Sequence, residues 1–117
     1  MLNKSIVDSR ISFVIQEVLQ ASKDTLGSRL EKVILFGSYA RGDFDDESDI
    51  DFCIIANVPK EEATKWRRDI NKRMAGIDLE YDLLISLHVI NSSMFFNNVD
   101  ILPFYRNVLQ EGVELNG

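Results

Sequence analysis

Residues 37–51 read Gly-Ser-Tyr-Ala-Arg-Gly-Asp-Phe-Asp-Asp-Glu-Ser-Asp-Ile-Asp. They join two apolar runs, Val33–Phe36 and Phe52–Ala56, and each run predicts a β-strand. A turn of small residues that can receive a phosphate group is therefore followed by two carboxylates, Asp49 and Asp51. This combination predicts a magnesium-dependent nucleotide site between the two strands.

The spacing of Asp49 and Asp51 places both carboxylates on one face of the second strand, because successive side chains of a strand alternate between faces. Two carboxylates roughly 6 Å apart repel each other by about 3 kcal/mol at an effective dielectric of about 20. A fold that holds them in a cleft normally supplies a cation. Mg²⁺ fits best, since it takes hard oxygen ligands and is usually held by a few carboxylates together with substrate phosphates.

The turn before these carboxylates offers contacts to phosphate. Gly37 can adopt backbone angles that are closed to other residues, and it lets a phosphate approach the main chain. Ser38 supplies a hydroxyl group and is expected to cap a short helix over Tyr39–Arg41. The N–H groups at the start of such a helix would face an anion.

Together these motifs resemble the nucleotidyltransferase superfamily that includes DNA polymerase beta, and most closely its minimal nucleotidyltransferases. The match comprises the strand Val33–Phe36, Gly37-Ser38, Ala40-Arg41-Gly42, a five-residue spacer and Ser48-Asp49-Ile50-Asp51. The resemblance implies an α/β (α+β) fold of the polymerase beta-like type, with a small mixed sheet flanked by helices. It also implies transfer of a nucleoside monophosphate, with ATP as the expected donor of AMP.

A third carboxylate is expected from a further strand, predicted over Leu79–Leu87. Glu80 and Asp82 share one face of that strand, and an acid within an apolar strand is costly unless a cation or a partner meets it. The resemblance implies a third carboxylate in an apolar-Asp-apolar-apolar context, which Tyr81-Asp82-Leu83-Leu84 matches. We therefore expect Asp82 to be catalytic, with Glu80 as its competitor.

These residues predict a mechanism with two metal ions. Asp49 and Asp51 would hold the ion that bridges the phosphates, and Asp82 would join them in holding a second ion near the acceptor oxygen. Such chemistry depends on positioning and charge neutralisation more than on a protein nucleophile.

Four residues are expected to bind the nucleotide or support its site. Gly37 and Ser38 would grip the outer phosphates. Arg41 would either pair with the acid-rich loop or contact phosphate, and these alternatives are equally favoured. Ser48 would brace the second strand, so that its contribution is orientation.

Composition is consistent with one domain over residues 1–117, since 45% of the residues are hydrophobic and one core can form. The net charge of −6 argues against a protein that coats nucleic acid, so we expect nucleic-acid contact only through a partner. The charge is uneven: six acids lie within 43–51, whereas the next helical segment is basic.

The sequence also predicts a soluble, cytoplasmic protein without membrane contact. Its N-terminus lacks the apolar core of a signal peptide, and no apolar run approaches the roughly 20 residues that span a bilayer. Cys53 is the one cysteine and lies inside an apolar strand, which fits a small core residue in a reducing compartment.

The remaining patterns predict helices over about 9–22 and 60–74, strands over 31–36 and 49–56, and a closing strand Val113–Leu115. Between them we expect a helix capped by Asp100, with Pro103 in its first turn. The segment Met94–Phe96 either closes the core or forms an apolar surface for a partner.

The chain offers no segment for a separate acceptor-binding domain. The resemblance implies that minimal members are often encoded with a helical partner of the HEPN type, as antitoxins of toxin–antitoxin pairs, and that some adenylylate that partner. Two alternatives stay open: an interaction protein that neutralises its partner by binding alone, and a stand-alone transferase for a small hydroxylated molecule. A homo-oligomer is a further possible assembly.

Overall fold

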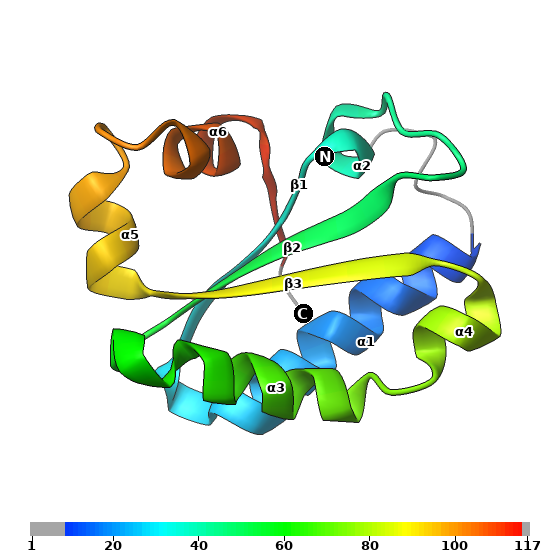
Figure 1. Ribbon diagram of the computed structural model, residues 1–117, viewed down its shortest axis with the longest axis horizontal. Helices are drawn as coiled ribbons and strands as arrows, with labels where there is room; N and C mark the ends of the chain where they lie inside the picture. Colours follow the sequence, from blue (N-terminus) through cyan, green and yellow to red (C-terminus); the bar gives the residue numbers. More distant parts are fainter. Residues whose placement is uncertain (1–8, 116–117) are drawn as a thin grey trace.

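A computed structural model describes residues 9–115 of the chain (Figure 1). The described elements, in chain order, are α1 (Ser9–Leu26), β1 (Leu30–Phe36), α2 (Ser38–Arg41), β2 (Asp49–Ala56), α3 (Ala63–Arg73), α4 (Ile77–Tyr81), β3 (Leu84–Asn91), α5 (Ser92–Asn98), α6 (Pro103–Glu111) and β4 (Val113–Leu115). Short 3₁₀ turns, η2 (Gly27–Arg29) and η3 (Lys60–Glu62), precede β1 and α3.

The strands form a mixed sheet in the order β3-β2-β1-β4. β1 runs antiparallel to both β2 and β4, and β2 runs parallel to β3. A parallel pair needs a crossover connection, and α3 and α4 supply it. The mixed sheet with flanking helices confirms the fold class that the motifs predicted.

Helices cover the two faces of the sheet unequally. α1 and α3 pack against one face, where Val33 and Leu35 of β1 and Phe52 and Ile54 of β2 are buried in one core cluster (Figure 1). α5 and α6 pack against the other face, whose cluster includes Ile34, Cys53, Ile55, Ile90, Phe95, Tyr105 and Val108. The two clusters follow from the alternation of side chains along each strand.

Several sequence predictions hold at the level of single residues. β2 and β4 have the predicted bounds, and β1 begins one residue earlier than expected. The first helix continues to Leu26, and Gly27 follows it with a φ of 57°. Cys53 is fully buried, and burial raises the pKa of its thiol to about 12, as expected of a core residue.

The predicted strand over Leu79–Leu87 is wrong, because β3 covers Leu84–Asn91. Gly76, with a φ of 88°, starts the short helix α4 instead, and Asp82 ends it in the left-handed conformation at a φ of 54°. A residue in that conformation cannot continue an extended strand. The chain therefore enters the sheet two residues after Asp82.

The segment between β3 and β4 also differs from the prediction. Asn91 caps an unpredicted helix, α5, by accepting a hydrogen bond from the backbone N–H of Met94 at 2.8 Å. α6 begins at Pro103 after Leu102, so the expected cap at Asp100 is wrong. Within residues 9–115, no helix is long and apolar enough to cross a membrane.

Candidate active site

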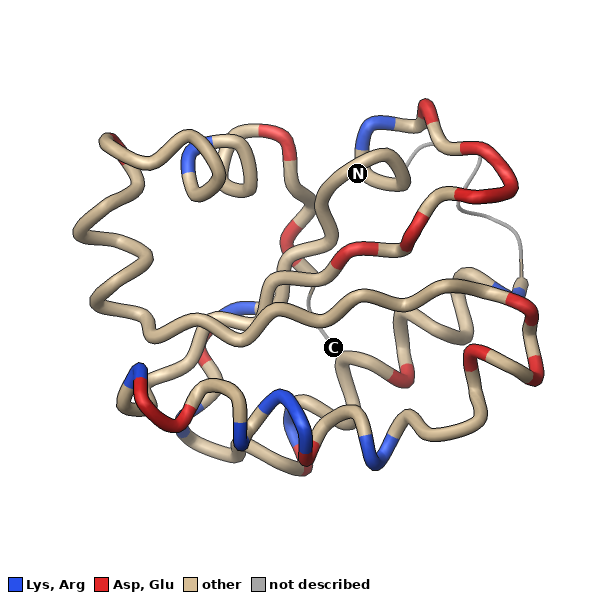
Figure 2. Tube along the Cα trace, in the orientation of Figure 1, with Lys and Arg blue, Asp and Glu red and all other residues tan. Residues whose placement is uncertain are grey.

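Asp49 and Asp51 lie at the open end of the sheet face that α5 and α6 cover only in part. The register of the strands places Phe36 beside Asp51 on one side and Ser86 beside it on the other. Asp49 begins β2 and is exposed, whereas Asp51 is half-buried. Figure 2 shows the concentration of acidic residues along the loop before β2 and at the start of this strand.

The surroundings of Asp51 disfavour its negative charge. Burial raises the pKa of Asp51, and the charge of Asp49 raises it further. His88 and Arg41 act on the pKa of Asp51 in the opposite direction and lower it. A divalent ion between the two carboxylates would relieve both the burial cost and the mutual repulsion.

The backbone of Gly37 packs closely against the carboxylate of Asp51. The φ of Gly37 is 76° and its ψ is −156°, a combination that other residues rarely adopt. A Cβ atom at this position would lie 2.5 Å from Asp51 Oδ2. The bare backbone at Gly37 thus leaves space for a carboxylate oxygen, and only glycine meets both requirements.

The short helix α2 follows this turn, but its cap differs from the prediction. Gly37 is the N-cap residue and has no side chain to offer, so Ser38 is the first helical residue and not the cap. Tyr39 is buried and stacks on Phe44 with ring centroids 4.0 Å apart. This stacking anchors the loop that leads to β2.

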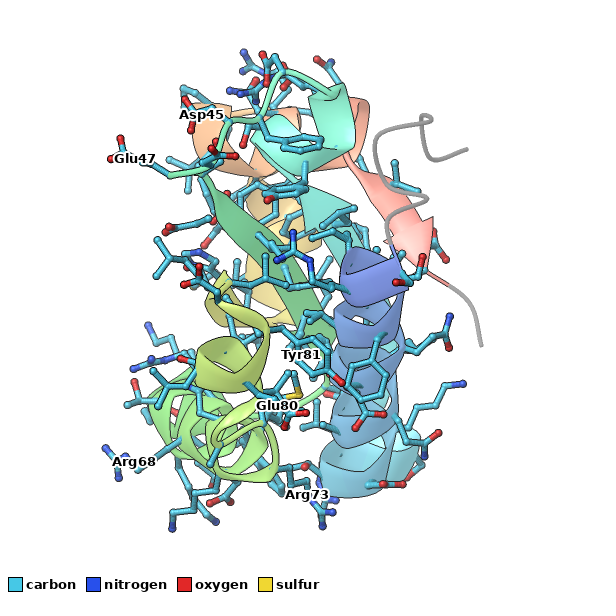
Figure 3. All side chains as sticks on the ribbon, turned by 90° about the vertical axis from the view of Figure 1, so that its right-hand side faces the viewer. Asp45, Glu47, Arg68, Arg73, Glu80 and Tyr81 are labelled. Atoms are coloured by element: carbon cyan, nitrogen blue, oxygen red, sulfur yellow. The ribbon has the colours of Figure 1, made fainter. Side chains whose placement is uncertain are left out.

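Ser48 braces that loop. Its hydroxyl accepts a hydrogen bond from the backbone N–H of Asp45 at 2.9 Å and lies 3.2 Å from Asp45 Oδ1. Asp45 Oδ1 also accepts a hydrogen bond from the backbone N–H of Glu47 at 2.9 Å. Asp45 and Glu47 lie at the outer edge of the molecule (Figure 3), and both are exposed.

Arg41 adopts one of the two arrangements that the sequence left open. Its Nε lies 3.1 Å from Asp43 Oδ2, and its Nη1 lies 3.4 Å from Glu111 Oε1 of α6. The side chain is exposed. Arg41 therefore pairs with the acid-rich loop and links it to α6.

Asp82 precedes β3 by two residues, and Leu84 at the start of that strand pairs in register with Asp49. Asp82 is exposed and borders a pocket together with Glu47, Ser48 and Asp78. Glu80 lies on α4, away from the loop of Glu47 (Figure 3). Among residues 9–115, no three His, Cys, Asp or Glu side chains are grouped to hold a metal ion. The catalytic role of Asp82 and the second ion stay predictions.

The sequence reasoning missed two polar residues that β3 does bring to the site. Ser86 pairs in register with Asp51, and His88 pairs with Cys53 on the same face. Their side chains meet, since Ser86 Oγ lies 3.2 Å from His88 Nε2. The signal was present as Ser86 and His88 alternating with apolar residues in Leu84–Asn91, but its meaning depends on the register between β2 and β3.

Comparison with known proteins agrees with this arrangement. The sequence model described as "Nucleotidyltransferase domain" matches residues 15–113. The chain belongs to this nucleotidyltransferase family. Two proteins of Methanocaldococcus jannaschii, named "Putative protein adenylyltransferase" MJ0604 and MJ0141, are 38% and 36% identical to it, over 84% and 79% of this chain and 90% and 91% of their own length.

Solved structures share the fold of this nucleotidyltransferase. A "putative nucleotidyltransferase" from Sulfolobus solfataricus superposes with a TM-score of 0.60 at 23% identity, covering 96% of this chain and 86% of the other. A chain of the toxin–antitoxin MntA-HpeT superposes with a TM-score of 0.52 at 16% identity, covering 87% and 72%. At these identities the likeness concerns the fold alone.

The raised pKa of Asp51 predicts that its ionised carboxylate lowers the free energy of unfolding of this nucleotidyltransferase. The pKa of Asp51 is higher in the folded than in the unfolded protein. Below the unfolded pKa the carboxyl is protonated in both states and does not reduce the free energy of unfolding. As the pH rises through the folded pKa the carboxyl ionises in the folded protein and destabilises the fold. Asp51→Asn should therefore raise the melting temperature of the metal-free protein by a few degrees at pH 7, and the gain should vanish toward acidic pH.

The matched control is Asp46→Asn, which removes the same charge from the exposed loop. Thermal unfolding followed by circular dichroism, with and without Mg²⁺, measures both variants. If the folded pair of carboxylates holds Mg²⁺, the ion should stabilise the wild type more than Asp51→Asn. A lower melting temperature for Asp51→Asn in the metal-free protein at pH 7 contradicts the assignment.

Proposed function

We propose that this nucleotidyltransferase transfers AMP from ATP to a hydroxyl group of a protein acceptor in a magnesium-dependent reaction. The acceptor oxygen bonds to the α-phosphorus as the bond to the bridging oxygen breaks, and pyrophosphate leaves with that electron pair. The observation that carries the proposal is the placement of Asp49 and Asp51 on one strand face, with Asp51 against the bare backbone of Gly37. The names of the Methanocaldococcus relatives support adenylyl transfer to protein.

Asp49 and Asp51 would hold the Mg²⁺ ion. Carboxylate oxygens are the donors that Mg²⁺ prefers, and the raised pKa of Asp51 reflects a charge that a cation would stabilise. When bound, Mg²⁺ neutralises the charge of the triphosphate and of the departing pyrophosphate. Asp82 keeps its predicted role as a ligand of a second ion, which the variant Asp82→Asn described below tests.

The phosphate side of the site would be formed by the turn between β1 and α2. Gly37 lets a phosphate approach the main chain, and Ser38 offers its hydroxyl group at the first turn of α2. Arg41 and Ser48 would act indirectly, since their side chains engage Asp43, Glu111 and Asp45. Their contribution is the shape of the loop between α2 and β2.

We further propose that the acceptor is a separate helical protein of the HEPN type, so that the chain acts as an antitoxin. The fold neighbour from the toxin–antitoxin MntA-HpeT is consistent with this proposal. The large hydrophobic residues that remain exposed near α5 and α6 support it as well: Met94, Phe96, Ile101, Leu102, Phe104 and Leu109. Phe95 is fully buried, so the segment Met94–Phe96 both closes the core and contributes to this surface.

Co-expression with the protein encoded by the adjacent reading frame tests the proposed acceptor. We expect a complex that survives gel filtration, and labelling of the partner on incubation with α-³²P-ATP and Mg²⁺. Asp49→Asn should form the same complex and leave the partner unlabelled, because the variant removes a proposed metal ligand without touching α5 or α6.

Two outcomes would favour the other candidates. A stable complex without labelling under any nucleotide indicates neutralisation by binding alone. The absence of a group of three metal-ligating side chains among residues 9–115 is consistent with this alternative. Labelling of small hydroxylated molecules without any partner indicates a stand-alone transferase.

A further inference from the structure

The strand register shows which residue of β3 lies nearest to the aspartate pair. β2 and β3 pair in parallel from Asp49 opposite Leu84 to Asp51 opposite Ser86. Side chains that are paired in register on neighbouring strands share a face of the sheet. Ser86 is therefore the residue of β3 that lies beside Asp51, whereas Asp82 precedes the strand altogether.

His88 holds the Ser86 side chain in place. Its Nε2 lies 3.2 Å from Ser86 Oγ, within hydrogen-bond distance in either tautomer. The imidazole ring lies 5.6 Å from the ring of Phe36 and 5.8 Å from the ring of Phe104, measured between centroids. The rings of Phe36 and Phe104 lie 5.5 Å from each other, so the imidazole packs against this pair of rings and is held beside the serine hydroxyl.

The pair borders a groove in the surface. The groove has a volume of about 520 Å³ and is lined by Ser86 and His88, by Phe104 of α6, and by Thr64 and Arg67 of α3. β3 is the edge strand of the sheet, so this groove is open along the side that no strand covers. Ser86 therefore both borders this groove and pairs in register with Asp51.

We propose that Ser86 receives the acceptor hydroxyl and that His88 positions Ser86 for this task. Ser86 is then a catalytic residue. Ser86 Oγ accepts a hydrogen bond from the attacking hydroxyl and aims its oxygen at the α-phosphorus. As the new oxygen–phosphorus bond forms and pyrophosphate leaves, the hydroxyl proton passes to water in the groove.

This inference rests on the proposed adenylyl transfer. A test with water as the acceptor separates the role of Ser86 and His88 from the adenylyl transfer itself. Enzyme in excess over α-³²P-ATP, with Mg²⁺, gives the single-turnover rate at which AMP and pyrophosphate are released. Ser86→Ala should lower this rate by about 10²-fold, the typical cost of a misplaced reactant, while the Kd for ATP stays within about twofold. Ser93→Ala, an exposed serine of α5, is the matched control and should change neither quantity.

Variants of His88 test its positioning role. His88→Ala should lower the rate by about tenfold with ATP affinity unchanged, and His88→Gln should recover most of the loss because its amide can still hydrogen-bond to Ser86. His88 is the one histidine of the chain, so its imidazole NMR signal is unambiguous. That signal should shift in Ser86→Ala and stay unchanged in Ser93→Ala.

Asp82→Asn tests the proposed ligand of the second ion separately from Ser86. We expect Asp82→Asn to lower the transfer rate with the Kd for ATP largely unchanged, and Ser86→Ala to lower the rate as well. Loss of transfer in Asp82→Asn with normal transfer in Ser86→Ala would overturn the inference. A wild type that binds ATP and Mg²⁺ but releases no AMP would overturn the proposed function, and the inference with it.

Discussion

Asparagine in place of Asp51 should lower the rate of AMP transfer by about 10³-fold or more. The substitution keeps the volume of the side chain and removes one negative charge from the pair that is proposed to hold Mg²⁺. A metal ion contributes several kcal/mol of charge stabilisation in phosphoryl chemistry, and each 1.36 kcal/mol corresponds to a tenfold change in rate. Release of labelled AMP and pyrophosphate under single-turnover conditions measures the loss.

Asp46→Asn again serves as the matched control, since Asp46 is exposed in the loop before β2. Its transfer rate should stay within about twofold of the wild type. Equal losses in both variants would mean that the total charge of the acid-rich loop matters, and not the position of Asp51. The expected rise in melting temperature of metal-free Asp51→Asn excludes unfolding as the reason for its inactivity.

Alanine at Gly37 should abolish transfer almost as completely. The added Cβ atom would lie 2.5 Å from Asp51 Oδ2, so either the carboxylate or the turn must move. A displacement of about 1 Å at a reacting centre costs on the order of 10²-fold in rate. We expect a loss of this size in single-turnover transfer, with weaker binding of ATP because the same turn approaches the phosphates.

Gly76→Ala separates this clash from backbone strain. Gly76 has a φ of 88°, close to the 76° of Gly37, but a Cβ atom there has no neighbour within 4 Å. Both variants should lose about 1 kcal/mol or more of stability because alanine rarely adopts a positive φ, and urea unfolding measures this loss. Gly76→Ala should keep its transfer rate, and a loss equal to that of Gly37→Ala would refute the specific contact with Asp51.

The part of the site that the sequence predicted depends on local geometry. Asp49 and Asp51 are separated by one residue of a strand with clear apolar flanks, so their common face follows from the alternation of side chains. Gly37 stands directly after the apolar strand that ends at Phe36, where a tight turn needs glycine. Both inferences require only the neighbouring residues.

The part that the sequence could not predict depends on contacts between distant segments. Asp82 is flanked by apolar residues in a strand-like pattern, but its left-handed conformation ends α4 and excludes it from β3. The pairing of Ser86 with Asp51 depends on the position at which β3 joins β2 after the crossover through α3 and α4. No local sequence pattern predicts the register between these two strands. The same applies to α5, whose signal is the single cap at Asn91.

Titration calorimetry of ATP into the purified protein tests the central claim, a metal-bridged nucleotide at Asp49 and Asp51, most directly. We predict binding in Mg²⁺ that weakens by at least about tenfold when EDTA removes the metal. We also predict that the weaker binding of Asp51→Asn responds little to Mg²⁺, while Asp46→Asn behaves like the wild type. Equal affinity of the wild type for ATP with and without metal would contradict the account.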